Sequence, residues 1–200
     1  MRIIGLTGGI GTGKTTVSNY LTHHYQLPVL DADIYAREAV QLGSPVLGEI
    51  YKRYGTDVQQ PDGTLNRKRL GEIVFNHPLE RQWLEQQIHP YVRDRFQSAL
   101  DTLVASTVVL VVPLLFEANM TDLITEIWVV SCSPEQQLER ILKRDREKFP
   151  IDNPLSLEQA QARINSQLPL QEKVSRADVV LDNSSTPEAL LKQVDLALLY

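Results

Sequence analysis

Near the amino terminus, glycines surround one lysine at a spacing that suits phosphate binding. Residues 8–15 match the pattern G-x-x-x-x-G-K-[ST] in full. Glycines allow the backbone to curl so that successive N–H groups point toward phosphate oxygens, and a helix that begins just after them adds its positive end. The pattern therefore predicts a nucleoside triphosphate site formed by Gly8, Gly11, Thr12, Gly13, Lys14, Thr15 and Thr16.

Three side chains of this segment have distinct expected roles. Lys14 is long enough to bridge the β- and γ-phosphates of ATP, and the hydroxyl of Thr15 is a suitable ligand for Mg²⁺. Thr16 follows directly, where its N–H or hydroxyl can meet the α-phosphate. We therefore expect ATP as the phosphoryl donor and Mg²⁺ as the cofactor.

Several classes of protein share such a segment, so other residues must decide between them. The sequence has no Asn-Lys-x-Asp segment for reading guanine, which argues against a GTPase switch. The apolar run that ends at Val112-Pro113 has no acid at its tip, which argues against an ATPase that activates water. Glu117 follows a few residues later, and two interpretations of it stay open: contact with the metal through water, or the start of a short helix.

The acids that follow a strand lie elsewhere. Asp31 and Asp33 close the apolar segment Pro28–Leu30. Ligands of open α/β sheets bind outside the carboxyl ends of the strands, where a carboxylate can accept the proton of an attacking hydroxyl. We favour Asp33 as this base; if a helix already begins here, Asp31 or Asp33 is instead its N-cap. Arg37 lies one helical turn later and can hold Asp33 or a substrate phosphate.

Cations for the transition state come from a later segment. Arg140 and Arg144 are one helical turn apart, and guanidinium groups bind phosphate in a bidentate fashion. A solvated face of alternating charge is the competing interpretation, because acids interleave with these residues. Arg163 is a weaker candidate. His89, in Ile88-His89-Pro90, is a candidate substrate contact or a structural histidine.

Five apolar, β-rich segments can position these residues, and helical patterns alternate with them. The predicted strands are Arg2–Thr7, Pro28–Leu30, Thr107–Pro113, Glu126–Cys132 and Ala177–Leu181. The predicted helices are Lys14–Tyr25, Pro78–Leu103 broken near Pro90, Pro134–Lys148, Ser156–Gln167 and a last one opening at Thr186-Pro187. Near-continuous apolar strands indicate a five-stranded parallel sheet flanked by helices, an α/β fold of the P-loop kinase type.

Two segments are longer than the connections that this sheet needs. More than seventy residues separate Asp33 from Thr107, whereas a crossover needs only about a dozen. We therefore predict one domain with core residues 1–33 and 104–200, a helical substrate-binding insertion at about 34–103 and a lid at about 140–171. A helical hairpin without a binding role is the alternative for the insertion, and a surface excursion is the alternative for the lid. A kinase that phosphorylates a hydroxyl of a bulky substrate accounts for these parts.

Composition limits the other functions. A formal net charge of −5 over 200 residues gives no bulk attraction to nucleic acid or anionic lipid, and no segment is long enough to span a membrane. The single cysteine, Cys132, is expected to be a buried thiol at the end of a strand. We expect a cytoplasmic enzyme, a monomer or small homo-oligomer, that binds neither nucleic acid nor membrane.

The chain resembles the dephospho-coenzyme A kinase family along almost its whole length. The resemblance rests on residues 4–15, Asp31-Ala32-Asp33 followed by Ala36-Arg37, Ile88-His89-Pro90, residues 112–117, residues 137–140, residues 162–167 and residues 177–183. It implies transfer of phosphate from ATP to the ribose 3′-hydroxyl of dephospho-CoA. It also implies Asp33 as the base, Lys14 and Arg140 as stabilisers of the moving group, and ATP and dephospho-CoA as the bound partners. Another nucleoside or nucleotide kinase, or an ATP-binding switch, remains the alternative.

Overall fold

In a computed structural model, the chain forms two compact units. The structure describes residues 1–148 and 155–199, without the side chains of residues 76 and 148. The first unit combines Met1–Leu30 with Ala105–Tyr200, and the second is Asp31–Val104. The phosphate-binding segment belongs to the first unit, whereas Asp33 belongs to the second.

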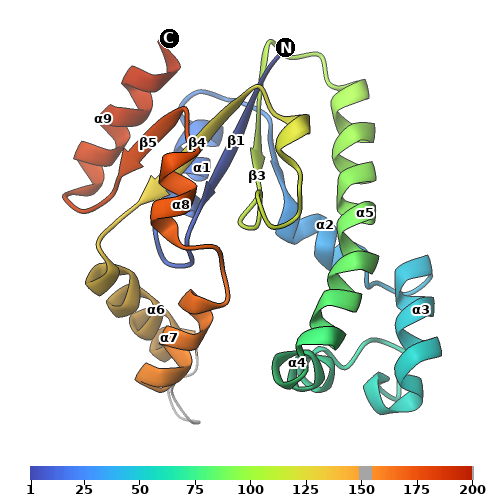
Figure 1. The fold of residues 1–200 in the computed structure, drawn as a ribbon. Helices are drawn as coiled ribbons and strands as arrows, with labels where there is room; N and C mark the ends of the chain where they lie inside the picture. Colours follow the sequence, from blue (N-terminus) through green and yellow to red (C-terminus); the bar gives the residue numbers. More distant parts are fainter. Residues whose placement is uncertain (149–154, 200) are drawn as a thin grey trace. The chain divides into compact units, whose positions relative to one another are not determined.

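A five-stranded sheet organises the first unit, with the order β2-β3-β1-β4-β5 (Figure 1). The paired strands β1–β3, β1–β4 and β4–β5 are parallel. The predicted parallel sheet is therefore confirmed. Its strands are β1 (Arg2–Gly8), β2 (Val29–Asp31), β3 (Thr107–Val111), β4 (Glu126–Ser131) and β5 (Val179–Asp182).

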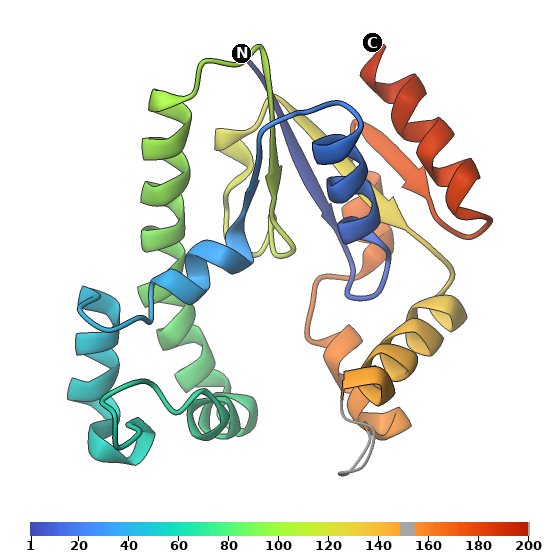
Figure 2. The ribbon, with the colours of Figure 1, turned by 180° about the vertical axis from the view of Figure 1, so that it is seen from behind.

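Helices cover both faces of this sheet, which explains why the central strands are apolar on both sides. Helices α1 (Lys14–His23) and α9 (Pro187–Leu198) pack on one face, where Val17 and Leu190 join a core around β1 (Figure 2). Helix α8 (Leu170–Ser175) packs against β4. Thr186 caps α9, as predicted, because its hydroxyl accepts a hydrogen bond from the N–H of Ala189 at 3.3 Å.

The remaining elements of the first unit lie before and after β4. A short 3₁₀ turn, η2 (Thr121–Leu123), precedes β4, and the helix α6 (Pro134–Lys148) follows β4. Helix α7 (Leu157–Asn165) packs against α6. Ser156 and Gln159 form a capping box at the start of α7, and this fixes where the helix begins. The predicted lid, residues 140–171, includes residues 149–154, which lie outside the described residues.

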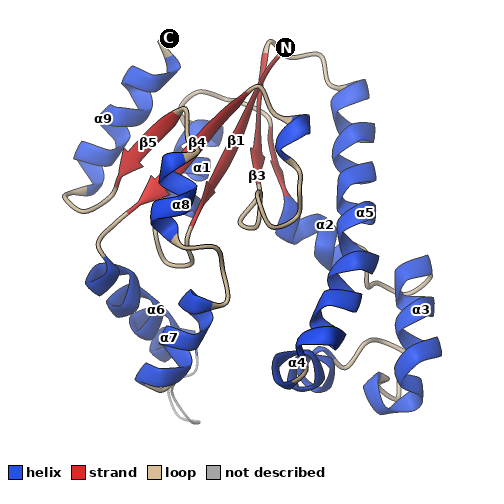
Figure 3. Ribbon diagram, viewed as in Figure 1, coloured by secondary structure: helices blue, strands red, loops and turns tan. Residues whose placement is uncertain are grey.

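The second unit is built from helices, as Figure 3 shows. Its elements are α2 (Ala32–Glu38), α3 (Pro45–Tyr54), η1 (Gly55–Val58), α4 (Arg67–Asn76) and α5 (Pro78–Thr102). An isolated antiparallel bridge joins Gln59 to Leu65. The unit has its own apolar core, in which Leu47, Ile50 and Val58 are buried.

One prediction about this unit was wrong. Helix α5 runs without interruption through Pro90, although a break was expected there. Proline removes one N–H donor and crowds the preceding turn, so a helix continues through it only when other contacts offset that cost. Here α5 packs against α2, α3 and α4, and its Val92 and Phe96 are buried just beyond the proline.

Other expectations differ from the structure by a few residues. The first helix ends at His23 instead of Tyr25, and the third strand ends at Val111 instead of Pro113. Cys132 is buried at the end of β4, as expected. None of the helices in the described part of the chain combines the length and the apolar composition needed to cross a membrane.

Candidate active site

The phosphate-binding loop connects β1 directly to α1. Gly13 is the N-cap of α1 and has a φ of 109°, in the left-handed region that favours glycine. A side chain at this position would also collide with the amide of Asn183. The glycines thus serve two purposes: they permit the turn, and they let other elements approach the loop closely.

Side chains from distant parts of the sequence hold the tip of the loop. The Nε2 of Gln137, on α6, donates to the carbonyl of Ile10 at 2.7 Å. The Oε1 of Gln167, just beyond α7, accepts from the N–H of Ile10 at 2.9 Å. The buried amide of Asn183, which follows β5, donates to the carbonyl of Thr12 at 2.8 Å. The loop is therefore held in a fixed shape by three amide side chains.

Lys14 is directed back along the loop. Its ammonium group donates to the carbonyls of Gly8 at 2.9 Å and Gly9 at 2.7 Å. Thr15 and Thr16 are exposed in the first turn of α1, where N–H groups of a helix start are available to an anion. This arrangement offers backbone donors, a lysine and two hydroxyl groups to a polyphosphate.

Arg140 is the cation that the structure places beside this loop. Its guanidinium donates to the carbonyl of Asn183 at 2.9 Å and lies 3.5 Å from the carbonyl of Thr12. Burial raises the pKa of the neighbouring Cys132 thiol, and the positive charge of Arg140 opposes that shift. Arg140 is thus partly buried against the loop, and its role in stabilising the moving phosphoryl group stays a prediction.

The other two arginine candidates lie farther along the lid segment. Arg144 is exposed one turn after Arg140 on α6, and its expected contact with ATP stays a prediction. Arg163, on α7, lies 3.9 Å from Asp145 of α6 and forms a salt bridge with it. In the described structure, Arg163 therefore joins two helices of the first unit.

A buried ion pair lies next to the end of β3. Lys173, on α8, is completely buried, and its ammonium group lies 2.9 Å from Oε1 of Glu117 and donates to the carbonyl of Pro113 at 2.9 Å. Glu117 lies in a turn, so it does not open a helix as one interpretation proposed. Its Oε2 is buried and has no hydrogen-bond partner among the described residues.

In the second unit, the two acids at the carboxyl end of β2 have different surroundings. Asp31 is the N-cap of α2, and its side chain accepts from the N–H of Asp33 at 2.8 Å. Burial raises the pKa of Asp31, while this hydrogen bond opposes the rise. Asp33 is exposed in the first turn of α2. The capping role therefore belongs to Asp31, which leaves the carboxylate of Asp33 available for chemistry.

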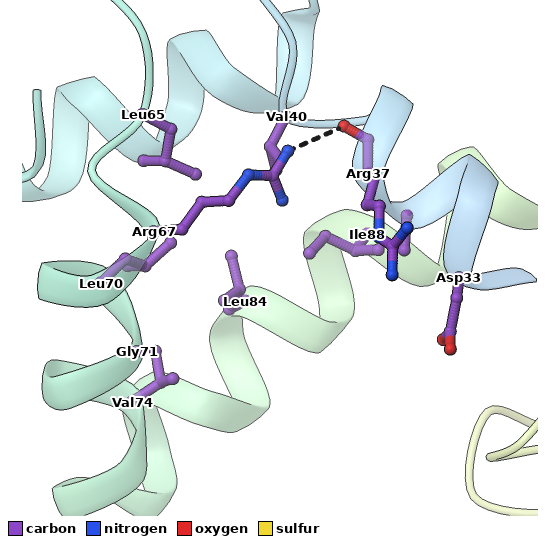
Figure 4. A pocket seen from close by; sticks show the side chains of 11 residues that line it. Asp33, Arg37, Val40, Leu65, Arg67, Leu70, Gly71, Val74, Leu84 and Ile88 are labelled. Atoms are coloured by element: carbon purple, nitrogen blue, oxygen red, sulfur yellow. Dashed lines mark hydrogen bonds between the residues drawn. The ribbon is translucent and has the colours of Figure 1, made fainter. Parts of the chain in front are cut away.

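Asp33 and Arg37 line a pocket of about 380 Å³ that lies entirely within the second unit (Figure 4). Arg67 and Gly71 of α4 also line it, together with an apolar wall formed by Val40, Leu65, Leu70, Val74, Leu84 and Ile88. His89 is not among the lining residues. Burial lowers the pKa of His89, and its role as a substrate contact stays a prediction.

Three features of the site were not predicted from the sequence. Arg67 lines the pocket, Lys173 is buried against Glu117, and Gln167 holds the tip of the phosphate-binding loop. The sequence offered one indication, because Asn66 is a good N-cap residue and places Arg67 at the first position of a helix. The burial of Lys173 had no local indication at all.

A parallel sheet with a glycine-rich loop, a lysine and a helix start after its first strand defines a P-loop nucleotide-binding protein. A model of the dephospho-CoA kinase family matches residues 2–188 of the chain. A dephospho-CoA kinase of Trichormus variabilis is 62% identical over 197 residues, which cover 98% of this chain and 96% of that protein. The chain therefore belongs to the dephospho-CoA kinase family.

Solved structures agree with this assignment. A crystal structure of a Thermus thermophilus protein has a TM-score of 0.80 and 32% sequence identity, and the match covers 99% of this chain and 96% of the other. A dephospho-CoA kinase from Campylobacter jejuni has a TM-score of 0.68 and 26% identity, with the same coverage of 99% and 96%. The predicted P-loop kinase fold is thus confirmed.

Proposed function

We propose that this protein transfers the γ-phosphoryl group of ATP to the ribose 3′-hydroxyl of dephospho-CoA, giving coenzyme A and ADP. The observation that carries this proposal is the family match over residues 2–188. The phosphate-binding loop supports it as the donor site, and the pocket of the second unit, with an exposed carboxylate at one side, supports it as the acceptor site. Catalysis requires the two bound substrates to meet.

In this mechanism, the donor site neutralises charge while Asp33 handles the proton. Asp33 accepts the proton of the 3′-hydroxyl as its oxygen bonds to the γ-phosphorus, and the bond from that phosphorus to the β–γ bridging oxygen breaks. Lys14 and Arg140 stabilise the negative charge that spreads over the moving group and the departing ADP. The loop N–H groups from Gly11 to Thr16 hold the phosphates in line.

Thr15 is the residue that we propose to hold Mg²⁺. Mg²⁺ keeps several waters and binds through one or two protein ligands together with substrate phosphates, so an exposed hydroxyl at the start of α1 suits it. Among the described residues, no group of three or more His, Cys, Asp or Glu side chains is placed to form a separate cage. When bound, the ion supplies charge neutralisation at the β- and γ-phosphates.

A coupled ADP-release assay tests the reaction, with mass spectrometry and NMR locating the new phosphate. Phosphate on the ribose 3′-oxygen of dephospho-CoA supports the proposal, whereas turnover only with nucleosides or nucleotides would replace it with the nucleotide-kinase alternative. ATP binding without any turnover would favour the alternative of an ATP-binding switch that transfers no phosphate. The cytoplasmic location and the small oligomeric state stay predictions.

Asp33→Asn tests the role of the base. We expect kcat to fall by about a hundredfold or more, the scale of a positioned acid–base group, while the Kd values of ATP and dephospho-CoA stay near those of the wild type. Asp57→Asn is the matched control, because Asp57 is an exposed acid of the same unit that does not line the pocket. An unchanged kcat in Asp33→Asn would remove Asp33 from the mechanism.

A further inference from the structure

The pocket of the second unit has charged and apolar parts in a definite order. Figure 4 shows Asp33 and Arg37 of α2 at one side, the guanidinium of Arg67 in the middle, and Leu70 and Val74 of α4 at the other side. Starting at Asp33, a ligand that fills the pocket passes two cations and then reaches Leu70 and Val74, while Ile88, Leu84 and Val40 line the pocket beside the arginines (Figure 4).

The two arginines of the pocket differ from most arginines of this unit. Arg53, Arg69, Arg81 and Arg95 each form a salt bridge with a glutamate. For Arg37 and Arg67, by contrast, no salt bridge joins the guanidinium to a carboxylate within the described part of the chain. Burial raises the pKa of Asp31 and the charge of Arg37 lowers it, so Arg37 faces one acid, whereas no acid is paired with Arg67 in the described structure, and the charge of Arg67 makes the middle of the pocket attract an anion.

Arg67 is held in place by the neighbouring helix. It is the first residue of α4, and its Nη2 donates to the backbone carbonyl of Arg37 at 3.3 Å. This bond uses one of the five N–H donors of a guanidinium, so the others remain to grip a phosphate. The same hydrogen bond joins the side chain of Arg67 to the backbone of Arg37. Both guanidinium groups lie along the same pocket (Figure 4).

This order of groups is the order within dephospho-CoA itself. Starting at the ribose 3′-hydroxyl, the molecule continues through the 5′-pyrophosphate to the pantetheine arm. We infer that Arg67, with Arg37, binds the pyrophosphate of the acceptor and that the apolar residues of α4 beyond them, Leu70 and Val74, hold the pantetheine arm. The adenine is attached to the ribose and not behind the pyrophosphate, so this arrangement leaves it outside the apolar end. The inference rests on the proposed function.

Arg67→Gln tests the cationic part. We expect the KM and the Kd of dephospho-CoA to rise roughly 10- to 100-fold, because one charge-assisted phosphate contact is lost, while the KM of ATP stays unchanged. Binding of adenosine, which lacks the pyrophosphate, should stay within about twofold of the wild type. Arg69→Gln is the matched control, because Arg69 lies on the same helix but forms a salt bridge with Glu72.

Gly71→Leu tests the apolar part without straining the backbone. Gly71 lines the pocket in α4, and a Cβ there would meet no atom within 4 Å. The leucine should fill part of the pocket and weaken inhibition by 4′-phosphopantetheine about tenfold or more, with adenosine binding unchanged. Gly48→Leu is the control, since Gly48 lies in α3 of the same unit and also faces open space.

The outcomes separate this inference from the proposed function. If the wild-type protein turns over dephospho-CoA and Arg67→Gln has the same KM for dephospho-CoA, the inference is overturned and the proposed function stays intact. An equal loss of adenosine binding in Arg67→Gln would contradict the assignment of Arg67 to the pyrophosphate. If Gly71→Leu weakens adenosine binding and spares 4′-phosphopantetheine, the adenine occupies the apolar wall and the proposed order is wrong.

Discussion

The buried pair of Lys173 and Glu117 leads to a stability prediction that can be worked out from the structure. Lys173 has a side-chain exposure of 0%, against 24% for Glu117. Replacing Lys173 with Met keeps most of the apolar stem but removes the ammonium group from two acceptors, Glu117 and the carbonyl of Pro113. The variant therefore leaves a partly buried carboxylate without its counter-charge.

The expected loss of folding free energy follows from the interaction that the carboxylate of Glu117 loses. Removing one partner of a buried ion pair typically destabilises a protein by about 3–5 kcal/mol. The backbone N–H of Leu168 still donates to Oε1 of Glu117 at 2.9 Å in the variant, so we expect the lower end, about 3 kcal/mol. At about 2–4 °C per kcal/mol for a chain of this size, the Tm should fall by about 6–12 °C.

Differential scanning calorimetry of three variants tests this reasoning. Lys192→Met is the matched control, because Lys192 is exposed on α9 of the same unit and should change the Tm little. Glu117→Gln combined with Lys173→Met removes both charges and should recover part of the loss. The reasoning fails if Lys173→Met melts within about 2 °C of Lys192→Met, since the pair would then contribute no more than a surface lysine.

Two further predictions concern other charged groups. Arg140→Lys should still lower kcat about tenfold or more in the ADP-release assay, because a point charge cannot replace a planar fork; full activity would make Arg140 dispensable. Hydrogen bonds from Arg53 and Tyr54 lower the pKa of Glu80 to about 2, so its contribution to the stability of the second unit is present above the ordinary glutamate pKa and is lost as the pH falls toward 2. Melting from pH 6 to pH 3 should show a steeper fall in Tm for the wild type than for Glu80→Gln, and parallel curves would contradict this.

The sequence by itself determined the sheet and the phosphate-binding loop, because both depend on local patterns. Continuous apolar runs such as residues 107–111 are stable only when both faces are covered, and so they indicate a parallel sheet. The phosphate-binding loop needs its glycines at fixed spacing within one turn. The N-cap role of Asp31 was within reach for the same reason, although the sequence did not separate it from Asp33.

Only the tertiary structure decided which distant side chains meet. Gln137 and Gln167 are 30 positions apart, yet both hold Ile10, because the packing of α7 against α6 brings the two side chains to the same loop. Pro90 predicted a break, but the packing of α5 against three other helices offsets one missing hydrogen bond. Lys173 and Arg67 look like ordinary surface cations in the sequence. The structure buries Lys173 against Glu117 and places Arg67 in a pocket. Both properties depend on residues that the chain brings together only when it folds.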